Sequence, residues 1–118
     1  MPPLVLASTS RYRAQLLARL GLPFESVRPE VDERPLPGEP PATLALRLAA
    51  AKAGAVAAAR PDALVLGSDQ VASCDGRILG KPGNRDAAIA QLQRMSGREA
   101  VFLTAVALAR AGEPVEQA

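Results

Sequence analysis

Short apolar runs alternate with longer periodic stretches along this chain, and that order predicts strands alternating with helices. Aliphatic runs of strand length lie at residues 4–7, 24–27, 63–71 and 100–108. Longer stretches with helical spacing or an Ala- and Leu-rich composition lie at residues 11–20, 42–60 and 84–95. We therefore expect an α/β domain with a mixed sheet.

Local signals set the limits of two of these elements. Ser10 is a suitable cap for the first helix, and Gly21 ends that helix. The apolar face of the helix is expected to be formed by Leu16, Leu17 and Leu20. The pair Asp75-Gly76, between the short runs 71–73 and 77–79, is typical of a hairpin turn.

Residues 29–41 have a different composition, with five of the eleven prolines and four acidic residues. Proline and charge at this density predict an extended, solvated connection. The chain also ends soon after its last predicted strand. Because a sheet needs cover on both faces, we expect part of this fold to be missing from the chain.

Composition excludes several classes of protein and of site. The 118 residues suffice for one domain, and a net charge of +2 without a clustered basic stretch does not indicate a nucleic-acid partner. The absence of histidine removes imidazole bases and ligands, and the single Cys74 excludes an internal disulfide and a cysteine zinc site. The N-terminal apolar run is too short for a signal peptide or a membrane span, so we expect a cytoplasmic protein with no membrane partner.

Asp69 carries the strongest signal for function. It comes at the end of an aliphatic run that predicts a buried strand, where an unpaired carboxylate is energetically costly. An acid in such a place usually has a cationic partner, a metal or a role in proton transfer. The alternative is an ordinary turn cap just past the strand. The small neighbours Gly67 and Ser68 favour a ligand site because they leave room beside the carboxylate.

Two lysines stand out because the chain has twelve arginines and no other lysine. Lysine is expected where a compact ammonium serves better than a guanidinium. Lys81 lies in a tight Gly-Lys-Pro loop, and Lys52 lies inside the predicted helix of residues 42–60. For each, the alternative is an ordinary exposed lysine, on a loop or on a solvated helix face.

The start of the first predicted helix is a candidate anion site. Ser8 and Ser10 offer hydroxyls, the helix N-terminus offers free backbone N–H groups, and Arg13 adds a positive charge. A capped helix with surface arginines is the alternative. In the proline-rich connection, Asp32 and Glu33 are either solvated or supply oxygen ligands to Mg²⁺.

In combination these motifs resemble the Maf family of nucleotide pyrophosphatases. The matching runs follow in the family's order: Leu6-Ala7-Ser8-Thr9-Ser10 with Arg13, Val31-Asp32-Glu33, Lys52-Ala53, Gly67-Ser68-Asp69-Gln70-Val71, Gly80-Lys81-Pro82 and Met95-Ser96-Gly97. One departure is Arg11, where the family usually has proline. The resemblance implies a Maf- and ITPase-like mixed sheet flanked by helices. Residues 1–118 would then be the N-terminal portion of a single domain, with the C-terminal part of the fold missing.

The resemblance also implies an activity, hydrolysis of a nucleoside triphosphate between its α- and β-phosphates. Asp69 would accept a proton from the attacking water, and a divalent metal, Mg²⁺ or Mn²⁺, would be held by Glu33 and Asp69. The residues implied in substrate binding are Ser8, Ser10, Arg13, Lys52 and Lys81. The family resemblance further suggests a homodimer.

Within the family, Tyr12, Gln70 and the run from Ser96 to Phe102 resemble the branch that removes the modified nucleotide 7-methyl-GTP. An aromatic ring stacked on cationic N7-methylguanine gains a cation–π interaction, and an amide can hydrogen-bond a purine edge. A dTTP or UTP pyrophosphatase is the alternative within the family. A nucleotide-binding module without turnover and a structural or partner-binding fragment are the alternatives outside it.

Overall fold

The structure, a computed structural model, describes residues 3–74, 77–79, 84–86, 89–90, 93, 100–113 and 115–117. The elements within these residues are β1 (Leu4–Ala7), α1 (Arg11–Ala18), β2 (Glu25–Val27), α2 (Pro41–Ala59), β3 (Leu64–Cys74), β4 (Arg77–Leu79), β5 (Ala100–Ala109) and β6 (Glu116–Gln117). The four predicted strands and the first two predicted helices are confirmed. Half of the third predicted helix, residues 84–95, lies outside the described residues, and residues 85–86, 89–90 and 93 are helical.

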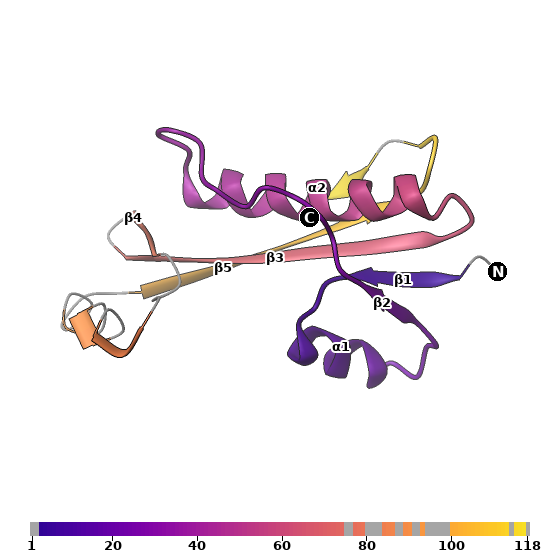
Figure 1. Cartoon of the computed structure of the whole chain (residues 1–118), viewed down its shortest axis with the longest axis horizontal. Helices are drawn as coiled ribbons and strands as arrows, with labels where there is room; N and C mark the ends of the chain where they lie inside the picture. Colours follow the sequence, from indigo (N-terminus) through magenta and orange to yellow (C-terminus); the bar gives the residue numbers. More distant parts are fainter. Residues whose placement is uncertain are drawn as a thin grey trace.

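Among the described residues the sheet has six strands, in the order β2-β1-β3-β5-β6, with β4 paired to β3. Strand β1 runs parallel to β2 and β3, whereas β3 runs antiparallel to β4 and β5. The predicted mixed sheet is therefore confirmed, and so is the β3–β4 hairpin, although its turn residues Asp75 and Gly76 lie outside the described residues. Figure 1 shows β3 and β5 as two long, paired strands.

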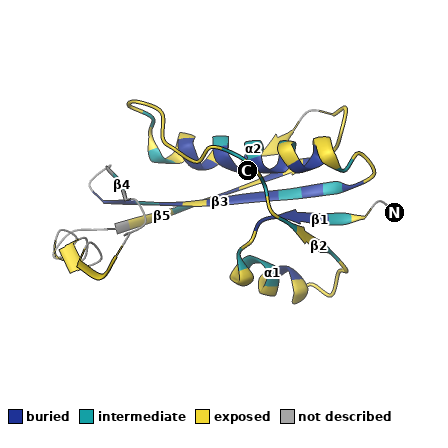
Figure 2. Cartoon of the chain, viewed as in Figure 1, coloured by how far each residue is buried: buried dark blue, intermediate teal, exposed yellow. Residues whose placement is uncertain are grey.

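Helix α2 covers one face of this sheet (Figure 1). Proline at its first turn fits the helix N-terminus, and the alanines and leucines that follow favour helix. Its side towards the sheet is buried, as Figure 2 shows, and the core is aliphatic: Val5, Leu44, Leu48, Val56 and Val65. Of the helices in the described residues, α2 alone has the length and mean hydropathy, 1.3, to cross a membrane. Here that apolar composition serves to bury the helix against the sheet.

Gly67 sets how closely α2 approaches β3. A Cβ built on Gly67 would collide with the carbonyl oxygen of Ala49 and would lie 2.8 Å from the backbone nitrogen of Ala53. The helix and the strand thus meet with no side chain between them. The prediction that Gly67 leaves room for a ligand is wrong, because the space above it is filled by the backbone of α2.

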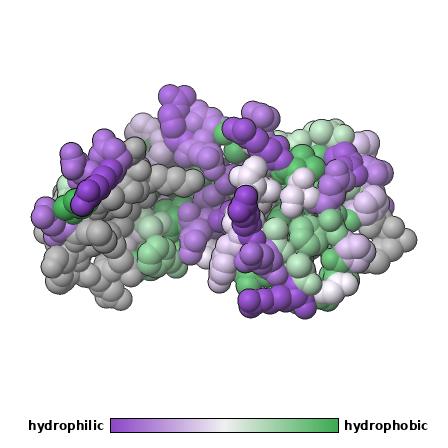
Figure 3. Space-filling model, turned by 60° about the horizontal axis from the view of Figure 1, so that its bottom comes forward, coloured by the Kyte–Doolittle hydropathy of each residue, from purple (hydrophilic) through white to green (hydrophobic). Residues whose placement is uncertain are grey.

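The opposite face of the sheet is only partly covered. Helix α1 buries Leu17 there, and Leu16 and Leu20 line the same cavity as Leu17, which confirms that the three leucines share one face. Leu16 is nevertheless 42% exposed and Leu20 is 68% exposed. Farther along this face, side chains of β5 are open to solvent: Phe102, Val106 and Leu108. Figure 3 brings the side of α1 forward and shows hydrophobic surface open between hydrophilic stretches.

Candidate functional site

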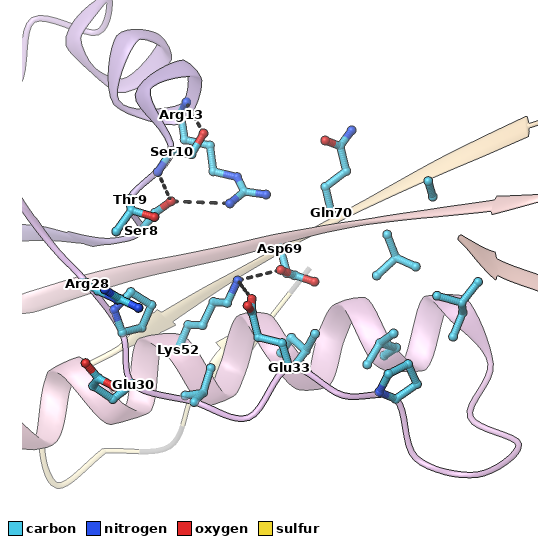
Figure 4. A pocket seen from close by; sticks show the side chains of 18 residues that line it. Ser8, Thr9, Ser10, Arg13, Arg28, Glu30, Glu33, Lys52, Asp69 and Gln70 are labelled. Atoms are coloured by element: carbon cyan, nitrogen blue, oxygen red, sulfur yellow. Dashed lines mark hydrogen bonds and ion pairs between the residues drawn. The ribbon is translucent and has the colours of Figure 1, made fainter. Parts of the chain in front are cut away.

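A cavity of about 840 Å³ opens where the end of β1, the β2–α2 connection and the middle of β3 meet. Its charged and hydroxyl-bearing walls come from four parts of the chain (Figure 4). The lining includes seven of the residues predicted from the sequence: Ser8, Ser10, Arg13, Glu33, Lys52, Asp69 and Gln70. The fold therefore brings together candidates that are far apart in sequence.

Lys52 lies between the two carboxylates of the cavity, Asp69 and Glu33. Its Nζ donates a hydrogen bond to Asp69 Oδ1 at 2.7 Å and lies 2.7 Å from Glu33 Oε1. Lys52 is 8% exposed and Asp69 is 7% exposed. Asp69 is in the middle of β3, opposite Ala105 of β5, rather than at a strand end. The two structural alternatives, a turn cap for Asp69 and a solvated helix position for Lys52, are therefore wrong.

The charge of Lys52 is stabilised by its partners. Burial by itself lowers the pKa of the Lys52 ammonium, but hydrogen bonds to Asp69 and Glu33 outweigh it, so that the pKa is raised above its ordinary value of 10.5. Lys52 is consequently a cation at neutral pH. The cluster of these three groups carries one negative charge in excess.

The hydroxyl-bearing wall faces these carboxylates from the start of α1. Ser10 caps α1 as predicted, since its Oγ accepts a hydrogen bond from Arg13 N at 3.2 Å. Ser8 Oγ accepts from Ser10 N at 3.0 Å and lies 3.5 Å from Arg13 Nη1. Because both hydroxyls serve as acceptors here, each keeps its own proton to donate to an anion. Figure 4 shows these three side chains on one side of β3, with Lys52 on the other.

The neighbouring acids Asp32 and Glu33 separate in the structure. Glu33 lines the cavity, but Asp32 turns outward and accepts hydrogen bonds from Arg34 N and from the Arg34 guanidinium. Hydrogen bonds from Arg34 lower the pKa of Asp32 to about 2. Asp32 is thus bound to a surface arginine, and only Glu33 is placed to act together with Asp69.

Sequence reasoning missed Arg47 and Glu39. Arg47 donates to both oxygens of the Glu39 carboxylate, at 2.7 Å and 2.9 Å, and to the carbonyl oxygen of Arg34 at 3.1 Å. The Glu39 side chain is only 4% exposed, so the prediction of a solvated connection is wrong at this point. The sequence did contain a signal for this pair, because Arg47 lies within a run of apolar helix residues, where a charged side chain needs a partner.

Comparison with known proteins places this chain in a family. A sequence model described as Maf-like protein matches residues 3–118. The chain belongs to the Maf-like family. Over 108 residues it is 62% identical to a 7-methyl-GTP pyrophosphatase of Xanthomonas campestris pv. campestris, covering 92% of this chain and 56% of that protein. It is 58% identical over 107 residues to a protein of the same description from Bordetella pertussis, covering 91% of this chain and 54% of that one.

The Maf-like chain thus spans about half the length of the curated relatives that it matches. Solved structures share its fold. The Ham1 protein of Staphylococcus aureus aligns with a TM-score of 0.66 and 17% identity, covering 98% of this chain and 67% of that one. A nucleoside-triphosphatase (dITP/XTP pyrophosphatase) of Mycobacterium abscessus aligns with a TM-score of 0.58 and 21% identity. The alignment covers 98% of this chain and 69% of that one. The predicted Maf- and ITPase-like α/β fold is confirmed.

A second cavity of this Maf-like chain, about 480 Å³, lies on the sheet face opposite α2. Tyr12 and Gln70, predicted from the sequence to select the base, both line it. Gln70 and Arg13 line the first cavity as well, whereas Tyr12 does not. Figure 4 shows Gln70 projecting from β3 on the side away from α2. Lys81, the remaining predicted substrate ligand, lies outside the described residues.

The donor atoms of the first cavity fit a hard divalent cation. Glu33 and Asp69 present carboxylate oxygens towards a single point of positive charge, the Lys52 ammonium. The described residues contain no group of three or more His, Cys, Asp or Glu side chains close enough to hold a metal. Mg²⁺ commonly binds through one or two carboxylates, with water and substrate phosphates completing its ligands. Two carboxylates therefore suffice for such an ion when phosphate is also bound.

Proposed function

We propose that this Maf-like chain contributes the catalytic wall of a nucleoside triphosphate pyrophosphatase. One observation carries the proposal: the buried Lys52 ammonium joins Asp69 to Glu33 in a cavity that Ser8, Ser10 and Arg13 also line. A carboxylate for the attacking water and donors for phosphate oxygens thus share one cavity. The proposed reaction is attack of water on the α-phosphorus, with cleavage of the bond between that phosphorus and the α–β bridging oxygen, to give a nucleoside monophosphate and pyrophosphate.

In this proposal Asp69 accepts the proton of the attacking water. Its position in the middle of a strand, hydrogen-bonded to Lys52, holds the carboxylate in a fixed orientation. Lys52 and Arg13 supply positive charge near the phosphates as negative charge develops, and the two serine hydroxyls donate to phosphate oxygens. These groups are in place before substrate arrives, which lowers the reorganisation needed for reaction.

Glu33 and Asp69 are the proposed ligands of a divalent metal, Mg²⁺ or Mn²⁺. When bound, such an ion would polarise the phosphate oxygens and offset their negative charge. Carboxylate oxygens are suitable ligands for either metal. The net negative charge of the two acids around Lys52 adds a favourable electrostatic term for that ion.

The proposed substrate is 7-methyl-GTP, in line with the description of the curated relatives. Tyr12 is 69% exposed at the second cavity, so its ring is free to stack on a cationic base. Gln70 lines both cavities and links a base in the second to phosphates in the first. A dTTP or UTP pyrophosphatase is the alternative. We place this activity in the cytoplasm and propose a homodimer as its assembly.

The decisive experiment compares Asp69→Asn with Asp32→Asn in pyrophosphate release from 7-methyl-GTP, GTP, dTTP, UTP and CTP. Loss of a general base lowers the rate by about 10²- to 10⁴-fold, so we expect that loss for Asp69→Asn. Asp32, which is paired with Arg34 on the surface, serves as the matched control and should retain turnover. Wild-type turnover in Asp69→Asn would refute the assignment.

Calorimetry, carried out together with the same assay, tests the second candidate function, a nucleotide-binding module without turnover. Nucleotide binding without pyrophosphate release from the unmodified chain would indicate a binding module, since the phosphate-facing groups can act without turnover. Absence of any nucleotide-dependent rise in melting temperature would instead favour a structural role, because a ligand that binds the folded state stabilises it.

A further inference from the structure

The β2–α2 connection is attached to α2 at two places along its path beside the cavity. Lys52 reaches Glu33, and Arg47 reaches both Arg34 and Glu39. The two basic residues are five positions apart on one helix, a rise of about 7.5 Å. Figure 4 shows the connection following α2 on the side where Glu33 points towards Lys52. The segment is thus held along the helix rather than at a single point.

The attachment at Arg47 has the features of a strong interaction. Arg47 binds the Glu39 carboxylate with two hydrogen bonds, a charge-assisted bidentate pair. The same carboxylate accepts a third hydrogen bond from Leu36 N at 3.1 Å. Its side chain is 4% exposed, and that of Arg47 is 32% exposed. Water therefore competes little for Glu39, which favours an ordered connection.

Glu33 needs such support. Its side chain is 58% exposed, so packing alone does not fix its carboxylate. The hydrogen bond from Arg47 Nη2 to the carbonyl oxygen of Arg34 restrains the residue directly after Glu33. An ordered backbone at this point lowers the entropy lost when the Glu33 carboxylate is held near Lys52.

We propose that Arg47 is a positioning residue: by holding Arg34 and Glu39 against α2, it places the Glu33 carboxylate beside Lys52 and Asp69. This inference rests on the proposed function, in which Glu33 and Asp69 hold the metal. Arg47 itself lies outside the lining of the cavity, so it acts through Glu33 and not by contact with substrate. Groups that orient metal ligands commonly change metal affinity by about 10- to 100-fold when removed.

Arg60 provides a matched control. It flanks the other end of α2, its Nη1 lies 2.7 Å from Glu25 Oε2, and its side chain is 30% exposed. The Arg60 pair is the weaker of the two, since Glu25 is 59% exposed, and it joins the end of α2 to β2 rather than to the connection. If Arg47 only stabilised the fold, its loss would not change exchange in the connection more than exchange elsewhere.

The experiment measures two properties of the 118-residue chain in its Arg47→Ala and Arg60→Ala forms. Hydrogen exchange without metal follows the Leu36 and Glu39 amides, which are hydrogen-bonded within the connection. Calorimetric titration with Mn²⁺ gives the metal Kd. For Arg47→Ala we expect at least about tenfold faster exchange at both amides and a Kd raised about 10- to 100-fold. For Arg60→Ala we expect neither change. In a Glu33→Gln background, Arg47→Ala should no longer alter the Kd.

The outcomes separate this inference from the proposed function. Unchanged exchange and unchanged Mn²⁺ affinity in Arg47→Ala would overturn the positioning role, and so would an equal loss of affinity in the Glu33→Gln background. Failure of the unmodified chain to bind Mn²⁺ would count against the proposed metal site, while the exchange rates would still decide whether Arg47 orders the connection. If Arg47→Ala does not fold, Arg47→Lys replaces it, because lysine keeps the charge but loses the bidentate geometry.

Discussion

The backbone nitrogen of Ala53 lies only 2.8 Å from the position that a Cβ on Gly67 would occupy. Ala53 directly follows Lys52, and Gly67 is two residues before Asp69 on the same face of β3. The close packing of helix on strand at Gly67 therefore adjoins the Lys52–Asp69 hydrogen bond. A larger residue at this position must push the two elements apart.

We expect Gly67→Ala to destabilise the protein by about 1–3 kcal/mol, the usual cost of overpacking, since backbone atoms cannot move aside. Gly54→Ala is the control. It also replaces a glycine by alanine, in α2 next to Ala53, but a Cβ at this position meets nothing within 4 Å. In a helix interior that change should stabilise by about 0.5–1 kcal/mol. Urea denaturation monitored by circular dichroism measures both. Equal effects of the two substitutions would contradict this account.

Lys52→Met should lower the free energy of unfolding by about 3–5 kcal/mol, because it leaves the buried Asp69 carboxylate without its cation. Their side chains are each 10% exposed, so water does little to replace the lost partner. Adding Asp69→Asn removes the unpaired charge, and the double variant should recover part of that loss. Chemical denaturation at neutral pH gives the comparison. A double variant less stable than Lys52→Met would show that Asp69 does not depend on Lys52.

Tyr12→Ala should reduce the use of 7-methyl-GTP relative to GTP by roughly 2- to 30-fold, the equivalent of a cation–π interaction of about 0.5–2 kcal/mol. Tyr12 is 69% exposed, so its loss should have little effect on stability. Leu20, which is 68% exposed and lines the same cavity, supplies the control. We expect Leu20→Ala to affect the two nucleotides alike. Ratios of kcat/KM test this, and equal losses for Tyr12→Ala would argue against stacking.

The Glu39–Arg47 pair should make stability depend on pH in the acidic range. Hydrogen bonds from Arg47 lower the pKa of the Glu39 carboxyl below its ordinary value of 4.5. A carboxyl whose pKa is lowered on folding contributes fully above its unfolded pKa, and the contribution is lost as pH falls through the folded pKa. Wild type should therefore lose stability more steeply than Glu39→Gln as the pH falls below the ordinary carboxyl pKa of 4.5. Denaturation midpoints across this range provide the measurement, and parallel curves would count against the pair.

The open face of the sheet should promote association of the chain with itself. Phe102 is 63% exposed and Val106 is 40% exposed on this face, and exposed apolar patches favour association. We expect concentration-dependent association in sedimentation velocity and a clear reduction in the Phe102→Ser/Val106→Ser variant. Leu36→Ser is the control, since Leu36 is 55% exposed but belongs to the connection. A wild-type chain that stays monomeric and melts cooperatively would show that this face needs no cover.

Much of the fold was determined by local sequence. Aliphatic runs predicted the strands, Ser10 marked the start of α1, and an Ala- and Leu-rich stretch marked α2, because backbone geometry and capping depend on neighbouring residues. Asp69 was recognisable for the same kind of reason, since a carboxylate within an apolar run needs a partner. The sequence thus indicated that a partner exists without identifying it.

Only the tertiary structure decided how those residues act together. It joined Asp69 to Lys52, which is 17 positions away in sequence, and it chose Glu33 over its neighbour Asp32. It also showed that Gly67 is needed for the approach of α2, although a glycine next to a candidate site first suggested space for a ligand. These features depend on how a helix, a strand and a connection distant in sequence pack together, and no local pattern specifies the distances between such elements.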